Sequence, residues 1–132
     1  PLIFLVILFN TNPRLSELKA GTKTTPANDQ DLEFYQRMGV AYVCSASRGN
    51  ESEFRKILSV ATNLLTTVLE QKHGGSIKQG RNKPEKIDPQ KLYGTIDFQL
   101  IGLSMQFCKD NVPKEIQEDF KAKLEKIREL KK

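Results

Sequence analysis

The sequence predicts an all-α fold in which four helices form a small bundle. Two segments, one over residues 51–73 and one after Asn111, repeat apolar residues at the spacing of an amphipathic helix. The links between the apolar segments are short, which favours neighbouring helices that alternate in direction. Two cysteines, Cys44 and Cys108, fall near the ends of the first and third expected helices, and up-down-up-down alternation brings these ends to the same pole.

The first expected helix begins near Asp31 and follows the run DLEFYQRMGVAYVCSAS. Asn28 or Asp29 can cap its start. The β-branched end of the run, VAYVC, could instead form a short strand. The residues expected on the buried face are Leu32, Tyr35, Gly39, Tyr42, Val43 and Ala46.

The second expected helix, residues 51–73, has the most regular pattern. Asn50 and Glu53 resemble a capping pair at its start. Gly74 and Gly75 can end it, because glycine adopts the left-handed conformation of a helix C-terminus. Its apolar face comprises Phe54, Ile57, Leu58, Ala61, Leu64, Leu65, Val68 and Leu69.

A basic loop, SIKQGRNKPEKI, leads into the third expected helix. Asp88 can cap this helix, and Pro89 fits its first position, where a missing N–H costs nothing. Residues 93–101 could alternatively form a strand, because apolar residues alternate there and Gly94 and Gly102 weaken a helix. The Asp-Pro start and the length favour the helix. Its apolar face comprises Leu92, Ile96, Leu100, Leu103 and Phe107.

The fourth expected helix lies within VPKEIQEDFKAKLEKIRELKK. Acidic residues gather at its start and Lys131 and Lys132 at its end, an order that suits the helix dipole. Its apolar stripe comprises Ile116, Phe120, Leu124, Ile127 and Leu130.

The chain opens with PLIFLVILFN, whose apolar run is too short to span a bilayer, which needs about 20 residues. We interpret residues 1–20 as part of a secretory signal peptide, with a cut between Ala20 and Gly21. The alternative is an N-terminal hydrophobic strand of the mature fold. The remaining residues, 21–132, are expected to form a single helical domain that starts with a flexible arm over residues 21–30.

Secretion makes a structural disulfide between Cys44 and Cys108 the expected state of the two cysteines. Asn50-Glu51-Ser52 is a sequon that makes Asn50 a candidate N-glycosylation acceptor, which supports secretion weakly. The predicted fold is therefore a four-helix, bundle-like small secreted domain with one disulfide.

The residue types point to binding rather than catalysis. Residues 21–132 hold 19 basic and 15 acidic residues, a net charge of +4, without a nucleic-acid-binding motif. The one histidine, His73, precedes two glycines at a helix end, where a dipole role is more typical than catalysis. No phosphate-binding loop or metal-ligand spacing is present, so we expect no enzyme, cofactor or metal. The candidate partner-binding residues are the basic ones of the loop, Lys78, Arg81, Lys83 and Lys86, unless the loop is only a solvated connector.

Two stretches carry a resemblance to a known family: DLEFYQRMGVAYVCSAS near the start of the expected domain, and SMQFCKDNVP before its last helix. The chain resembles the anopheline mosquito salivary family that includes albicin and anophensin, over essentially the whole of residues 21–132. The resemblance implies an inhibitor of host plasma cascades, because one member blocks the alternative complement convertase and another acts on the kallikrein-kinin contact system. It implies no catalytic motif, so no active-site residue is carried over.

We therefore expect a secreted, extracellular and monomeric inhibitor that docks on a host plasma protein complex. The alternative complement convertase is the first candidate and a contact-system protease the second. We expect neither nucleic acid nor a membrane as a partner. A different class of function remains open, namely a secreted carrier of a small apolar ligand.

Overall fold

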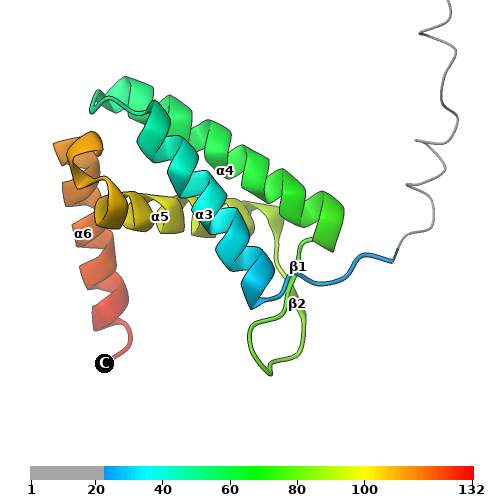
Figure 1. Ribbon diagram of the computed structural model, residues 1–132. Coiled ribbons are helices and arrows are strands. Elements are labelled where there is room, and N and C mark those ends of the chain that lie inside the picture. Colours follow the sequence, from blue (N-terminus) through cyan, green and yellow to red (C-terminus); the bar gives the residue numbers. More distant parts are fainter. Residues whose placement is uncertain (1–22) are drawn as a thin grey trace, which may run out of the picture.

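The computed structural model describes residues 23–132, and the predicted signal segment lies outside them (Figure 1). The described chain is mainly helical, with four α-helices and one disulfide, so the predicted all-α class is confirmed. Its elements are α3 (Asp29–Ala46), α4 (Glu51–His73), β1 (Ser76–Ile77), β2 (Glu85–Lys86), α5 (Pro89–Phe107), the 3₁₀ helix η1 (Lys109–Asn111) and α6 (Lys114–Glu129).

Side-chain caps determine where the first three of these helices start. Asn28 and Asp31 form a reciprocal capping box at α3, with each side chain bonded to the other residue's backbone N–H. The Asn50 side chain accepts from the Glu53 backbone N–H at 3.2 Å and starts α4 at the predicted residue. Asp88 caps α5, which contains the whole of residues 93–101 and thus resolves the choice between helix and strand.

Helices α3, α4 and α5 pack against one another and form the core (Figure 1). They approach one another closely at Gly39, where a Cβ atom would lie 2.8 Å from the side chains of both Leu65 and Leu100. Only a residue without a side chain lets α3 come this near to its two neighbours. The largest fully buried side chains are Phe54, Leu92, Leu100, Val43, Thr62, Ser47 and Ser104.

The predicted disulfide between Cys44 and Cys108 is confirmed. It joins the end of α3 to the residue that follows α5, with the two Cα atoms 5.8 Å apart. The Asn111 side-chain amide donates to the Cys44 carbonyl oxygen at 2.8 Å, so η1 is held at the same place. The ends of the first and third helices therefore meet at one pole, as the sequence predicted.

Three residues predicted for buried faces are instead exposed: Tyr42, Leu64 and Phe107. Tyr42 and Leu64 lie at the edges of the apolar stripes of their helices, whereas Phe107 is the last residue of α5. The core helices cover the centre of each stripe and leave these edges to solvent. The apolar spacing was therefore right about the helices, but it overestimated the width of the buried face.

Helix α6 departs from the expected alternation of four neighbouring helices. It packs mainly on α5, where the rings of Phe98 and Phe120 stack with their centroids 4.7 Å apart. Figure 1 shows α6 running across the end of α5, with its last turns extending away from the other helices. Ile116 is the buried residue of α6, whereas Ile127 and Leu130 of the predicted stripe are exposed.

The predicted arm, residues 21–30, is not free where the structure describes it. The Ala27 backbone N–H donates to the Ser76 carbonyl at 2.9 Å, and the Lys78 N–H donates to the Ala27 carbonyl at 2.8 Å. Ala27 is fully buried and pairs in parallel with Ile77, which also pairs with Glu85 of β2. This segment thus adds a single bridging residue to the two-stranded hairpin, and α3 begins within the predicted arm.

Gly39 and Gly94 provide a paired test of this packing. We expect Gly39→Ala to destabilise the protein by about 1–3 kcal/mol, because Leu65 and Leu100 are buried and have little room to move. Gly94→Ala should stabilise it by about 0.5–1 kcal/mol, because no atom lies within 4 Å of the new methyl group and alanine favours a helix. Urea unfolding of both variants measures the difference. A Gly39→Ala variant as stable as the parent would contradict the close approach.

Candidate functional site

The basic residues singled out in the sequence lie on the basic hairpin, defined as residues 76–87. All four of them are exposed, whereas Ile77 and Ile87 pack against the core at its two ends. The Gly80 N–H donates to Asp29 Oδ2 at 2.9 Å and fixes the far part of the hairpin to the start of α3. The structure therefore presents Lys78, Arg81, Lys83 and Lys86 together on one anchored, solvent-facing element.

His73 holds the base of this hairpin and is buried. Its Nδ1 lies 2.7 Å from the Thr25 carbonyl oxygen, and its Nε2 lies 2.9 Å from the Tyr35 hydroxyl. Because a carbonyl can only accept, Nδ1 carries the proton and the Tyr35 hydroxyl donates to Nε2. Both ring nitrogens are thus occupied by structural hydrogen bonds that join residue 25, α3 and the end of α4.

A cavity of about 280 Å³ lies between the basic hairpin and helices α3 and α5. Leu69, Leu92 and Ile96 form its apolar floor, and Lys83 and Lys91 are at its rim. Ligand sites usually measure about 300–1,000 Å³ and enclose most of the ligand. This space is near the lower limit, so it suits a small molecule better than a long apolar chain.

An apolar surface that the sequence analysis missed lies on α3 and α4. Its five members, here called the α3–α4 face, are each between 43% and 58% exposed, and all of them except Phe34 border a shallow groove of about 240 Å³. They form a second stripe on α3, at positions 34, 38 and 42, beside two positions of α4. Phe34 and Met38, four residues apart, were the available signal, whereas Tyr42 and Leu64 had been assigned to the apolar faces of their own helices. The α3–α4 face comprises Phe34, Met38, Tyr42, Val60 and Leu64.

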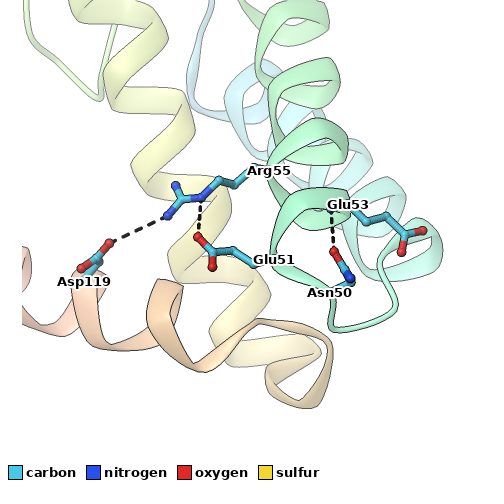
Figure 2. A network of polar contacts seen from close by, with 5 residues as sticks. All are labelled: Asn50, Glu51, Glu53, Arg55 and Asp119. Atoms are coloured by element: carbon cyan, nitrogen blue, oxygen red, sulfur yellow. Dashed lines mark hydrogen bonds and ion pairs between the residues drawn. The ribbon is translucent and has the colours of Figure 1, made fainter.

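The start of α4 joins α6 through a polar network (Figure 2). Arg55 Nε lies 2.9 Å from Glu51 Oε1, and Arg55 Nη2 lies 4.0 Å from Asp119 Oδ2. Glu51 also shares a hydrogen bond with Glu115, which lowers the pKa of Glu51 and raises that of Glu115. The charge of Arg55 also lowers the pKa of Glu51, and the negative charge of Glu51 also raises the pKa of Glu115. The network is exposed, so it orients α6 more than it stabilises the fold.

Asn50 lies close to this network, is exposed, and bonds to the Glu53 backbone (Figure 2). Its side-chain oxygen is used in capping, whereas a glycan would be attached to the side-chain nitrogen. Capping and N-glycosylation are therefore compatible at this residue, and its glycosylation stays a prediction.

A second cleft, of about 410 Å³, lies between α4, α5 and α6. Asp97 projects into it and lies 3.5 Å from the Thr62 hydroxyl. Burial raises the pKa of Asp97 above its ordinary value, although the Thr62 hydrogen bond and the charges of Lys123 and Arg55 oppose this shift. The cleft combines two carboxylates, Asp97 and Asp119, with two cations, Arg55 and Lys123.

Within residues 23–132, no group of three or more His, Cys, Asp or Glu side chains is placed to hold a metal ion. None of the four helices α3 to α6 is both long enough and apolar enough to cross a bilayer. The basic hairpin and the α3–α4 face are two exposed surfaces of residues 23–132 that could bind a partner.

Comparison with known proteins gives a family match. The family model described as "Domain of unknown function (DUF8650)" matches residues 30–131, which includes all four described α-helices except the first residue of α3. The chain belongs to this family. No curated protein and no solved structure matches it.

This DUF8650 domain offers a titration test in the second cleft. Because the pKa of Asp97 is raised on folding, its contribution to stability is present below its ordinary pKa of 3.8 and is lost as the pH rises through the folded value. Asparagine stays uncharged at every pH, so the Asp97→Asn variant does not lose stability as the pH rises. We therefore expect it to be more stable than the parent near pH 7. The two should converge below about pH 4, where the parent carboxyl is protonated.

Urea unfolding of both proteins across this pH range measures the effect. An Asp97→Asn variant that is less stable than the parent near neutral pH would show that attraction to Lys123 and Arg55 outweighs burial.

Proposed function

We propose that this protein is a secreted, non-enzymatic inhibitor that docks on a host plasma protease complex, first of all the alternative complement convertase. The α3–α4 face is the observation that carries the proposal. Its half-exposed side chains present an apolar patch on the order of 400 Å², the size of the largest patch on many monomers and often an interaction site. The face lies on two helices of a disulfide-linked core, so docking on it requires no refolding.

The basic hairpin supports the proposal through charge. Its four cations are exposed and close together, an arrangement that attracts an acidic partner surface and increases the rate of encounter. The resemblance of the sequence to the anopheline salivary family supports the choice of a plasma cascade as target. Residues 23–132 offer cleft and surface groups suited to binding, and we infer no turnover.

Two other functions compete with this proposal. Inhibition of the kallikrein-kinin contact system would use the same surfaces on a different protease complex. Transport of a small apolar ligand would use the cavity under the basic hairpin, but its volume and polar rim make it a poor site for a lipid chain.

Three assays run side by side distinguish these functions: alternative-pathway haemolysis, contact activation of plasma, and displacement of a fluorescent lipid. We expect dose-dependent slowing of haemolysis, with full effect near the concentration of the target complex and without cleavage of any component. Displacement of the probe with no effect in either plasma assay would contradict inhibition and favour the carrier.

The α3–α4 face can be tested by replacing Met38 and Leu64 together with Ser. Both side chains are about half exposed, so the fold should be retained, and we expect inhibition to weaken by tenfold or more. Phe107→Ser is the control, because Phe107 is an exposed apolar residue of α5 that lines a separate hollow with Val40 and Ala41 and none of the α3–α4 face. Equal inhibition by the double variant and the control would exclude the α3–α4 face as the contact surface.

The basic hairpin requires its own test, in which Lys78, Arg81, Lys83 and Lys86 are all replaced with Ser. We expect the fold to be unchanged and association with the target to slow several-fold, with a weaker dependence on salt. Exposed charges act mainly on the association rate and are screened over about 8 Å at physiological ionic strength. If the fourfold variant associates as fast as the parent at low salt, the basic hairpin is only a connector.

A further inference from the structure

The last part of α6 carries apolar side chains that nothing in the described chain covers. We call residues 121–132 the α6 tail. Leu124 is partly buried, Ile127 is 40% exposed, and Leu130 is 88% exposed. Exposure thus increases along the apolar stripe toward its end, and Figure 1 shows these turns extending beyond α5. Leu130 is the most exposed large apolar side chain in residues 23–132.

The α6 tail is also strongly basic. Its twelve residues, KAKLEKIRELKK, include six basic and two acidic side chains, a net charge of +4. This equals the net charge of the whole of residues 21–132, so the rest of that chain is neutral on balance. Within residues 23–132, the ion pairs all lie outside the α6 tail. Its cations are therefore free to bind a negatively charged partner.

The two kinds of charge lie on different sides of the helix. Each residue turns an α-helix by about 100°, so positions two before and two after Ile127 lie almost opposite to it. These positions are Glu125 and Glu129, the two acidic residues of the α6 tail. The basic residues Lys126 and Arg128 lie at about 100° on either side of Ile127. The exposed apolar stripe is thus bordered by cations, and the anions face away from it.

This arrangement narrows the choice of partner. Pairing with the α6 tail of a second copy would bring two sets of basic residues together, which like-charge repulsion opposes. A purely polar polyanion would use the cations but would leave Ile127 and Leu130 exposed. An anionic phospholipid surface uses both features, because apolar side chains enter the boundary between headgroups and acyl chains while lysine and arginine contact the phosphates.

We propose that the α6 tail binds peripherally to anionic phospholipid membranes through Ile127, Leu130 and the cations around them. This inference revises the expectation that the protein has no membrane partner, and it does not depend on the proposed inhibitory function. Because α6 projects from the end of α5, its last turns reach a membrane while the α3–α4 face stays available (Figure 1). Two apolar residues give little burial, so charge should supply most of the affinity.

The test is co-sedimentation of the secreted, disulfide-bonded protein with two kinds of vesicle. One kind is phosphatidylcholine alone, and the other contains about one-third phosphatidylserine. We expect binding to the anionic vesicles alone, with a loss of tenfold or more when Lys126, Arg128, Lys131 and Lys132 are all replaced with Gln. Ile127→Ser with Leu130→Ser should weaken binding several-fold. All six side chains are exposed, so the fold is not at risk.

The matched control is the variant of the basic hairpin with four Ser, which loses the same number of charges at a different site. We expect it to bind the vesicles within about twofold of the parent. Equal losses for the two fourfold variants would overturn the proposal and indicate attraction by net charge alone. Failure of the parent to bind anionic vesicles would also overturn it, as would retention on heparin through the α6 tail without any vesicle binding. Undiminished binding by the Ile127/Leu130 variant would remove the role of the apolar stripe and overturn it equally.

Discussion

The link between the end of α3 and the end of α5 is the constraint on which the rest of the structure depends. The Cys44–Cys108 bond closes a loop that contains the whole of α4 and the basic hairpin. A cross-link over such a loop lowers the conformational entropy of the unfolded chain and, by the chain-entropy estimate, stabilises the fold by about 4 kcal/mol. A domain of this size has a limited core, so this contribution is a large part of a typical stability. The bond also sets where η1 and α6 start, since Asn111 is bonded to the Cys44 carbonyl.

Local sequence signals predicted the helices well, because each signal acts over one or two turns. Asn50, Gly74 and Asp88 mark helix ends through their own backbone or side-chain bonds, and these bonds need no distant partner. The disulfide was predictable because only two cysteines are present. The exposure of Tyr42 and Leu64 was not predictable from periodicity, which identifies an apolar stripe but not the width that neighbouring helices cover. The bonding of Ala27 to Ser76 depends on two segments far apart in sequence, and no local pattern indicates it.

The two candidate surfaces differ in the same way, because one was predictable from a local pattern and the other was not. The basic hairpin was found from the sequence because its four basic residues lie close together in the chain. Charged side chains favour contact with water, so their exposure was also expected. The α3–α4 face is built from two helices, so its five residues become a surface only once the helices are placed side by side. The basic hairpin precedes α5 and the α6 tail follows it, and Figure 1 shows them near the two ends of α5, both projecting to the same side in that view. The basic hairpin carries a net charge of +3 and the α6 tail one of +4, so the remainder of residues 21–132 carries a net charge of −3.

The way the basic hairpin is anchored has a consequence for how this family can diversify. Its contacts with the body are made at the two ends, by Ile77 and Ile87, and at Gly80. Residues 81–84 are all exposed and contribute no side chain to the core. Extra residues inserted there would lengthen a loop whose ends stay fixed, at a cost of only about 0.6 kcal/mol for each doubling of its length. Relatives could therefore differ in the length and charge of this segment and so acquire different targets, while the helices and the disulfide stay the same.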